Sequence, residues 1–502
     1  MKVSMSDGLL RNVWWCTALA LILCWTPAQA QSPAPAAGPA ASTASTASPA
    51  STAAAESKFR IRPVDDAWRA GLPRDAAAAT QAYLDRLPAD VVARSNAYYE
   101  GGYWLRLWNW VAGMAVAFLL LATRPSTALR DWATRRLKWA PLRDGFYGAA
   151  YAAAGWVLTL PLSIYEGFVR EHAYGMATQT FAGWFGEQLV GLAVSLFIGA
   201  LLVAVLYAVL RRAGAQWWLW GTAVTLGFMA VMVAVAPIWI EPLFNTYKPV
   251  PDGPVKTAVL AMAHANGVPV DNVFVFDASR QTTRVSANVT GLFGTAAIRL
   301  NDNLLNRSSE PEILAVMAHE IGHYAMNHIT KSLVMFGAVI LFGFLFAQWA
   351  MRLLLARFGA RWRLDAKAGA ADVASLPLLV AVFSTYLLLA TPVLNTITRT
   401  QEVEADLYGL NLAREPHGEA EVLLKLVEYR KADPGALEEI IFFTHPGTRT
   451  RIYNAMRWRE QMLPDLAAGA AGAAGAAGAS GAAGAAGAAG APVPAASAPA
   501  RP

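Results

Sequence analysis

The sequence predicts a mainly α-helical protein that crosses a membrane several times and carries a smaller water-exposed part with a few β-strands. Three observations indicate this fold class. Apolar residues make up 55% of the 502 residues and charged residues only 15%, whereas about a quarter of the residues in a soluble protein are charged. Six apolar runs are long enough to cross a bilayer as helices. Between the fourth and fifth runs, short stretches of β-branched and aromatic residues bounded by turn residues are typical of strands.

The first 30 residues have the organisation of a signal peptide. Lys2 and Arg11 precede an apolar run, and small residues at positions 28–30 follow it as at a cleavage site. An uncleaved anchor is the alternative. Cys16 and Cys24 both lie within this apolar run. If the segment is cleaved, the mature chain has no cysteine, and disulfides and thiolate metal ligands are excluded.

Two low-complexity segments flank the remaining chain. Residues 31–57 are rich in Ala, Pro and Ser, and residues 461–502 form a tail rich in Gly and Ala. Neither contains enough bulky apolar residues to form a core, so we expect both to be disordered. The chain between them divides into an N-terminal membrane domain at residues 58–240 and a second domain at residues 241–460 that two further spans interrupt.

The four spans of the first domain and the two of the second follow from the hydropathy of the sequence alone. They are roughly Trp104–Ala122, Phe146–Phe168, Gln188–Leu210, Trp217–Ile240, Ser332–Leu355 and Leu376–Leu394. Tryptophan and tyrosine cluster at several of their ends, as in the aromatic belts of membrane proteins. Charged residues inside spans mark transport pathways. These runs contain almost none, which argues against a transporter.

The basic residues predict the orientation in the membrane. They gather in the first, third and fifth connections between spans, which are therefore expected to be cytoplasmic. The segment 241–331 and the residues after Asn395 are then periplasmic, and the protein belongs to a bacterial inner membrane. The net charge of +6 is not organised into an arginine-rich helix or basic stripe, so a nucleic-acid partner is not expected.

The water-exposed segment before the fifth span begins with strands and ends with a helix. Strands are expected at residues 272–277, 284–290 and 296–300, with Gly291 and Gly294 in a turn. A helix is expected to start near Ser309. Glu312 lies three residues later, as in a capping box, and Pro311 suits the first helical turn.

This helix contains the sequence His319-Glu320-Ile321-Gly322-His323. Residues four apart share a helical face, so His319 and His323 can bind one metal ion from the same side. Glu320 projects about 100° around the helix, near enough to reach a water on the metal. A zinc ion held by three protein ligands keeps one position for water and lowers its pKa, and a carboxylate can then take the proton. The motif is specific when it lies on a helix.

A third ligand is expected from the segment just after the last span. Glu402 and Asp406 are four residues apart and share a helical face. Glu402 can bind the metal while Asp406 holds a ligand histidine in its tautomer. Glu404 is the rival ligand but points to the opposite side. His328 is expected at the membrane interface or behind the ligands rather than on the metal.

These motifs resemble the type I CAAX prenyl proteases and their bacterial relatives, which are integral-membrane metallopeptidases. The resemblance covers about residues 60–460. It includes His319-Glu-x-x-His323 followed by two spans, and the Arg399-x-x-Glu402-x-x-x-Asp406 segment. Further matching segments are Glu241-Pro-Leu-Phe-Asn245, Asp277–Gly291 with the following Ile298-Arg-Leu-Asn-Asp-Asn-Leu, Thr444-His445-Pro446 and Arg451-Ile452.

The resemblance implies a fold and a set of roles. The fold is mainly α: a polytopic α-helical membrane protein with a gluzincin-type zinc metallopeptidase domain that carries a small β-sheet. His319, His323 and Glu402 would bind one Zn²⁺ per chain, and Glu320 would be the catalytic base. His445 would stabilise the oxyanion of the reaction. The residues expected to support the ligands from behind are Asp406, Arg399 and Asn395.

Substrate contacts are also implied by the resemblance. Ser286-Ala287-Asn288 aligns with an edge strand that usually reads Asn-Ala-Tyr, where an extended substrate would add as a further strand. Arg451 would pair with a carboxylate of the substrate or of the site. The expected function is a membrane-embedded zinc metalloendopeptidase, CAAX prenyl protease-like, acting on peptides or membrane-proximal protein segments. A heat-shock-type protease for membrane protein quality control, or a non-catalytic membrane chaperone on the same fold, is the alternative.

Overall fold

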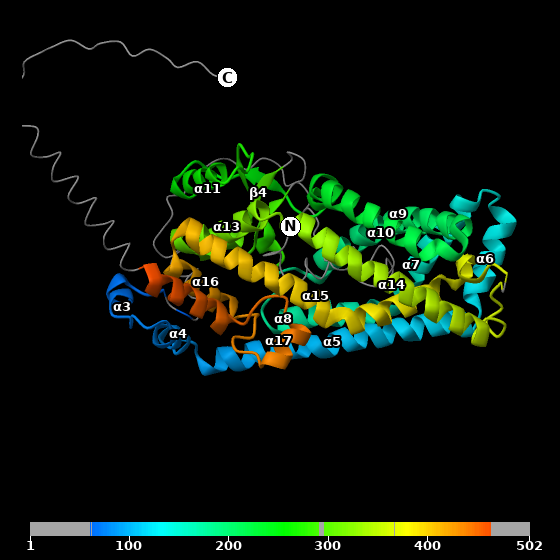
Figure 1. The fold of residues 1–502 in the computed structure, drawn as a ribbon, viewed down its shortest axis with the longest axis horizontal. Helices are drawn as coiled ribbons and strands as arrows, with labels where there is room; N and C mark the ends of the chain where they lie inside the picture. The colour runs from blue at the N-terminus through cyan, green and yellow to red at the C-terminus, as the bar shows by residue number, and fades with distance from the viewer. Residues whose placement is uncertain (1–60, 62, 291–295, 366, 463–502) are drawn as a thin grey trace, which may run out of the picture.

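The computed structural model describes residues 61, 63–290, 296–365 and 367–462. The expected signal peptide, the expected disordered segment 31–57 and the turn at Gly291 and Gly294 lie outside these residues. Of the expected disordered tail 461–502, residues 463–502 also lie outside them, whereas residues 461 and 462 are helical, so the predicted start of the tail was two residues too early. Long helices run side by side along the long axis of the molecule, while the sheet and several shorter helices gather at one end (Figure 1). The mainly α-helical fold with a small sheet is confirmed.

Each predicted span lies on a separate long helix. Five helical stretches of the described chain are long and apolar enough to cross a membrane, and one of them, Phe181–Leu243, contains two α-helices. The six helices are α5 (Ala89–Ala122), α7 (Ala140–Ile164), α9 (Phe181–Ala213), α10 (Trp217–Val235), α14 (His328–Phe358) and α15 (Leu376–Ala413). Helix α15 continues far beyond the predicted span, which ended at Leu394. This continuation brings the end of a membrane helix into the candidate site.

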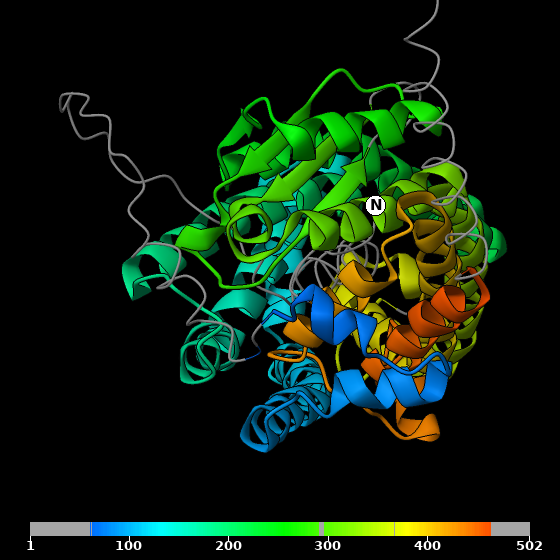
Figure 2. The ribbon, with the colours of Figure 1, turned by 90° about the vertical axis from the view of Figure 1, so that its left-hand side faces the viewer.

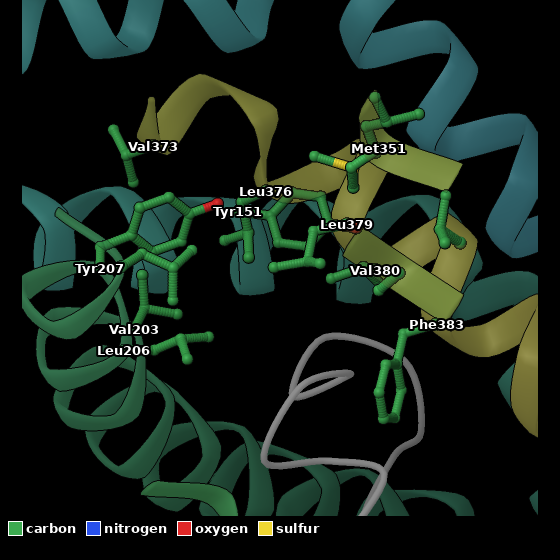
Figure 3. Packing of buried hydrophobic residues seen from close by; sticks show 14 of the residues in the cluster. Tyr151, Val203, Leu206, Tyr207, Met351, Val373, Leu376, Leu379, Val380 and Phe383 are labelled. Atoms are coloured by element: carbon green, nitrogen blue, oxygen red, sulfur yellow. The ribbon is translucent and has the colours of Figure 1, made fainter. Parts of the chain in front are cut away.

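The long helices pack through a shared apolar core. Helix α7 packs on α9, α10 on α14, and α15 on both α14 and α5. Tyr151 of α7 and Tyr207 of α9 are buried in the same cluster as Leu376, Leu379 and Phe383 of α15 (Figure 3). The outer faces of these helices carry exposed apolar side chains such as Phe197 and Leu389. Apolar residues on both the inside and the outside of the bundle are what a lipid environment requires.

The sheet has four short strands in the order β1-β2-β4-β3. They are β1 (Tyr247–Pro249), β2 (Val273–Phe276), β3 (Ala287–Thr290) and β4 (Ala297–Asn301). Strand β2 pairs with β4 in parallel, and the other two pairs are antiparallel. Three of these strands were expected, whereas β1 was not. It has only three residues and includes a proline, which cannot donate to a ladder and so fits an edge strand.

The sheet and the helix with the histidine motif share one core. Helix α13 (Glu310–Ala325) packs on β3, on α11 (Pro254–Ala265) and on α15. Ile298 and Leu300 of the sheet and Met317 and Ile321 of α13 are fully buried in this core. The apolar side of α13 is therefore fixed against the sheet, which leaves the histidine side to face α15.

The capping box expected at the start of α13 is wrong. Ser309 is the N-cap residue and Pro311 lies in the first turn, but the Ser309 side chain makes no capping hydrogen bond. Glu312 instead accepts two hydrogen bonds from Lys425 of α16 (Pro416–Leu426), at 2.6 and 2.9 Å. A buried carboxylate is stabilised more by a full positive charge than by one backbone N–H. Glu312 therefore pairs with Lys425 and does not bond the backbone N–H of the N-cap residue.

The N-terminal helices α3 (Asp66–Ala70) and α4 (Ala76–Leu84) lie at the end of the molecule that holds the sheet, where α4 packs on α16, on the end of α15 and on the helical residues 448–462. Tyr83 is buried against Leu423 of α16 and Ile452 of the helical residues 448–462. Figure 2 looks onto this end and shows α3 and α4 in blue beside the last helix in orange-red. Segments from both ends of the described chain thus enclose α16.

Short elements complete the chain. The remaining α-helices are α6 (Pro125–Arg136), α8 (Arg170–Ala173), α12 (Asp302–Arg307) and α17 (Ala436–Phe442). Single π-helical turns lie at Tyr165–Val169 and Ala236–Ile240, and 3₁₀ turns at Gly214–Gln216, Glu241–Leu243, Ala278–Arg280, Gly369–Ala371 and Val373–Ser375. Helix α6 lies at the end of the molecule opposite α13 and α16 (Figure 1).

Candidate metal centre and active site

Two helices from distant parts of the sequence bring the candidate ligands together. His319 and His323 lie on α13, and Glu402 lies on the continuation of α15. Gly409 explains how closely these helices approach, since a Cβ atom at this position would lie 2.9 Å from the backbone nitrogen of His319. Gly418 does the same between α16 and α13, where a Cβ atom would lie 2.4 Å from the carbonyl oxygen of Pro311. Neither contact has room for a side chain.

The three donor atoms converge on one point. The Nε2 atoms of His319 and His323 are 3.1 Å apart. Oε2 of Glu402 lies 3.3 Å from Nε2 of His319 and 3.6 Å from Nε2 of His323. Ligands about 2.0–2.1 Å from a tetrahedral zinc ion are separated by about 3.3–3.4 Å. The donor spacing therefore fits a small tetrahedral cation.

The environment of Glu402 also favours a cation. Its side chain is fully buried. Among the described residues, neither carboxylate oxygen has a hydrogen bond of normal geometry, although imidazole nitrogens lie close by. A buried charge is costly unless it is paired or binds a metal. Two imidazoles and one carboxylate form the donor set of an open zinc site, so the residues present fit this metal.

The outer nitrogen of each histidine is held by a separate partner. Nδ1 of His319 lies 2.8 Å from Oδ1 of Asp406, as the sequence predicted. Nδ1 of His323 lies 2.8 Å from Nδ1 of His328. The other ring nitrogen of His328 is 2.9 Å from Oε2 of Glu404. Both ligands therefore keep Nε2 for the metal side, because their Nδ1 atoms are engaged.

Glu404 is placed away from the metal side, in agreement with the expectation that it is not a ligand. It bonds His328 and also Lys331, whose Nζ atom is 2.7 Å from Oε2. His328 thus connects His323 to the ion pair between Glu404 and Lys331.

Arg451 pairs with a carboxylate of the site. Its guanidinium donates two hydrogen bonds to Asp406, at 2.8 and 2.6 Å, and lies 3.3 Å from Glu419. All three side chains are buried. The resemblance implied that Arg451 pairs with a carboxylate of the substrate or of the site. The structure shows the second pairing, because the guanidinium hydrogen bonds are made to Asp406. Sequence reasoning missed Glu419, because nothing in its neighbourhood on α16 signals a contact with residues 448–462.

Glu320 is buried beside the histidines. It follows His319 on α13, and its Oε1 atom has no hydrogen-bond partner among the described residues. Burial raises the pKa of Glu320 to about 8; the neighbouring His319 acts in the opposite direction and Glu402 in the same direction. This pKa is that of the protein without a cation, and a nearby cation would favour the charged carboxylate.

His445 lies next to the same carboxylate. Its Nε2 atom is 3.2 Å from Oε2 of Glu402, and its side chain is mostly buried. Its Nδ1 atom is 3.0 Å from the hydroxyl of Thr444. The loop after α17 thus contributes a third imidazole at the rim of the donor cluster.

Asn395 and Arg399 do not contact the metal donors. Asn395 donates a hydrogen bond to the carbonyl of Ile441 at 2.6 Å, and Arg399 donates to the carbonyls of Glu439 and Phe443 at 2.9 Å. Asn395 lies about two helical turns and Arg399 about one turn before Glu402 on α15, and their side chains are directed to the segment 439–443. Their hydrogen bonds instead fix the segment 439–443, which precedes His445.

Ser286, Ala287 and Asn288 are buried, and the last two lie on β3, the last strand in the order of the sheet. Strand β3 pairs only with β4 among the described strands, and it packs on α13. The backbone around Ser286 is fixed by two hydrogen bonds with Asn301, at 2.8 and 3.0 Å. Oδ1 of Asn288 is buried and has no hydrogen-bond partner among the described residues.

A His-Glu-x-x-His helix joined by a buried carboxylate at the end of a membrane helix defines a membrane-embedded metallopeptidase. Two family models match the chain: peptidase family M48 at residues 249–459, and the CAAX prenyl protease N-terminal region with five membrane helices at residues 74–246. The chain belongs to the CAAX prenyl protease-like metallopeptidases of peptidase family M48.

Individual relatives agree with this assignment. The uncharacterized metalloprotease YhfN of Bacillus subtilis is 29% identical over 67% of this chain and 79% of its own length. The CAAX prenyl protease 1 of Saccharomyces cerevisiae is 33% identical, over 36% of this chain and 40% of its own length. This chain therefore spans less than half of that relative. The crystal structure of S. mikatae Ste24p has the same fold, with a TM-score of 0.61, 20% identity, and coverage of 81% of this chain and 97% of Ste24p.

Proposed function

We propose that this protein is a zinc metalloendopeptidase whose Zn²⁺ is held by His319, His323 and Glu402. The observation that carries the proposal is the convergence of three buried donor atoms within 3.1 to 3.6 Å, with a carboxylate that has no hydrogen bond of normal geometry in the described part of the chain. When bound, zinc would polarise the scissile carbonyl and lower the pKa of a water molecule.

Glu320 is the proposed general base. It takes a proton from the attacking water and returns it to the nitrogen of the departing amine. Its burial and unengaged Oε1 atom support this role, because no neighbouring donor competes for the oxygen. Asp406 would hold His319 in the tautomer that presents Nε2 to the metal, and Arg451 would keep Asp406 in place.

His445 is proposed to donate a hydrogen bond to the oxyanion that develops on the substrate carbonyl. Its Nε2 atom already points toward the donor cluster, 3.2 Å from Glu402. Asn395 and Arg399 support this role indirectly, since they fix the segment Glu439–Phe443 that precedes His445. A donor fixed in this way does not need to reorganise during the reaction.

The substrate is proposed to be an extended peptide or a membrane-proximal protein segment. It would add to the edge of β3 through main-chain hydrogen bonds. The position of β3 against α13 supports this, since a strand added beyond β3 would run beside the His-Glu-x-x-His helix. The unsatisfied oxygen of Asn288 would then accept a hydrogen bond from the substrate. Prenylated CAAX peptides belong to this substrate class.

The protein is proposed to lie in a bacterial inner membrane with the metal centre on the periplasmic side. The basic connections support this orientation, because they all lie at the opposite end of the long helices.

The test combines metal content with proteolysis. Glu320→Gln should retain about one zinc per chain but lose about 10²- to 10⁴-fold in cleavage of an unstructured reporter peptide. A chelator should abolish cleavage by the unmodified protein, and added zinc should restore it. Zinc bound without any cleavage that depends on Glu320 would overturn the proposed enzyme and leave a binding function.

A further inference from the structure

A polar cavity lies at the end of the molecule opposite the candidate metal centre. It has a volume of about 670 Å³ and lies between α6, the start of α7, the end of α9 and the connection from α14 to α15. Figure 1 places α6 and this connection far from α13 and α16. Its lining side chains include five arginines and three aspartates: Arg130, Arg135, Arg143, Arg211, Arg363, Asp131, Asp365 and Asp372. The proposed peptidase chemistry uses none of them.

The aspartates of the cavity are already engaged. Asp372 is buried and pairs with Arg130 at 2.5 Å, and it also accepts the backbone N–H of Asp365. Asp131 pairs with the same arginine at 2.8 Å. The carboxylate of Asp365 accepts backbone N–H groups of residues 367 and 368. The ion pairs of Asp131 and Asp372 in the cavity are thus with Arg130, and the hydrogen bonds of Asp365 are with backbone N–H groups.

A fourth aspartate lies behind the wall. Asp144 is fully buried and is shared by Arg143, at 3.3 Å, and Arg211. The five lining arginines thus face four aspartates in and behind the wall, which leaves one positive charge in excess. In the part of the chain that the structure describes, no hydrogen bond or ion pair joins Arg135 or Arg363 to an acidic side chain.

Like Arg124 and Arg414 elsewhere in the described chain, Arg363 has a left-handed backbone conformation. Its φ is +54°. It ends the turn after α14, where the N–H of Leu364 bonds the carbonyl of Gly359 at 3.0 Å. Glycine is the residue favoured at such a left-handed position, yet this chain places an arginine there, at the cavity. Arginines in these connections follow the charge bias of membrane topology, but that bias does not require them to converge on one cavity.

The surroundings of the cavity are apolar and exposed. Trp132 and Trp139 beside it are 43% and 67% exposed, and Leu142 is 52% exposed. Trp132 packs on Phe146 with ring centroids 5.3 Å apart. Tryptophan at the end of a membrane helix marks the headgroup level of the bilayer. A cavity at this level receives a headgroup while the acyl chains lie along the apolar surface.

We propose that this arginine-lined cavity binds a singly charged phosphodiester, and that the ligand is the headgroup of an anionic phospholipid. Arginine matches phosphate geometry with its planar fork of donors. Basic pockets between membrane helices bind anionic headgroups by this means. The excess of one positive charge matches one phosphodiester, and the exposed tryptophans favour a lipid over a soluble phosphate.

The test uses the full chain in detergent with two matched double variants. Arg135→Gln/Arg363→Gln removes the two arginines of the cavity that lack an acidic partner in the described chain. Arg136→Gln/Arg361→Gln removes the same charge from the same connections, but neither residue lines the cavity. Native mass spectrometry would measure binding of phosphatidylglycerol and of zwitterionic phosphatidylcholine, and thermal unfolding would measure the effect of inorganic phosphate.

The expected result is preferential binding of phosphatidylglycerol that weakens about tenfold or more in the cavity variant. The control variant should bind it within about twofold of the unmodified protein, and peptide cleavage should be unchanged in both. Stabilisation by inorganic phosphate that the cavity variant alone loses, without lipid selectivity, would support the phosphate site and assign it a soluble ligand. Equal losses in both variants, or no binding of either ligand, would overturn the proposal.

Discussion

Each imidazole ligand is oriented by a group that does not touch the metal side. Asp406 holds His319 and is itself held by two hydrogen bonds from Arg451. His328 holds His323 and is held by Glu404. The first arrangement is a buried charge pair, while the second leads to the surface. Of the two proposed ligands, His319 is therefore the one whose supporting side chains are all buried.

Asp406→Asn should weaken zinc binding about 10- to 100-fold, the usual effect of losing a carboxylate behind a histidine ligand. The amide keeps the size of the side chain but loses the charge that favours the imidazole proton on Nδ1. Competition with a chromophoric chelator would measure the affinity. Asp252→Asn is the matched control, because Asp252 is exposed and far from the site. Unchanged affinity in Asp406→Asn would show that Asp406 does not orient the ligand.

At the scale of the helices, the site depends on how closely α13 approaches α15 and α16. The approach to α15 requires Gly409, and the approach to α16 requires Gly418. The ion pair between Glu312 of α13 and Lys425 of α16 lies on the side of α13 away from the sheet. The position of the His-Glu-x-x-His motif is thus set by two backbone contacts and one buried ion pair.

Gly409→Ala should destabilise the protein and lower its zinc content. The new methyl group would meet the backbone of His319, which cannot rotate away, and overpacking of this kind costs about 1–3 kcal/mol. Gly102→Ala in α5 is the control, since nothing lies within 4 Å of the added Cβ atom. Alanine favours a helix by about 1 kcal/mol over glycine, so the control should be neutral or more stable. Thermal unfolding and zinc content of the two variants would decide.

Lys425→Met should destabilise the protein by about 3–5 kcal/mol, because it leaves Glu312 charged and buried without its partner. The double variant Lys425→Met/Glu312→Leu should recover most of the lost stability, since an apolar pair of similar volume carries no desolvation penalty. Thermal unfolding in detergent would compare the three proteins. A double variant that is as unstable as the single one would show that packing rather than charge is responsible.

At the scale of the whole molecule, the metal centre and the arginine-lined cavity lie at opposite ends of the long helices (Figure 1). If the chain is oriented as its basic residues predict, these two ends face different compartments. The peptidase chemistry would then occur in the periplasm, and the cavity would contact the cytoplasmic leaflet.

Single-cysteine labelling would test this orientation. In a chain with Cys16 and Cys24 replaced by serine, Asp271→Cys lies in the part that packs on α13, and Lys138→Cys lies between α6 and α7. A maleimide that does not cross the inner membrane should label only the cysteine at position 271 in intact spheroplasts. Labelling of position 138 alone would reverse the proposed orientation. Lysed cells provide the control, in which both positions should react.

Local sequence patterns determined much of this protein. Six apolar runs gave the six long helices, and strand-like runs gave three of the four strands, because these patterns depend only on hydropathy and period. The spacing of His319 and His323 fixes both on one face of α13, and the spacing of Glu402 and Asp406 does the same on α15. The sequence also predicted the three residues, His319, His323 and Glu402, that the structure brings together.

Only the tertiary structure decided how these local elements meet. It showed that Asn395 and Arg399 bond the segment before His445 rather than the residues behind the candidate ligands. It also showed that Glu312 pairs with Lys425 instead of capping its helix. It also paired Arg451 with Asp406 and Glu419, and it gathered arginines from four separate segments around one cavity. Contacts of this kind join residues far apart in the chain, and no periodic pattern encodes them. Their geometry follows from the packing of whole helices, which the sequence specifies only through the complete fold.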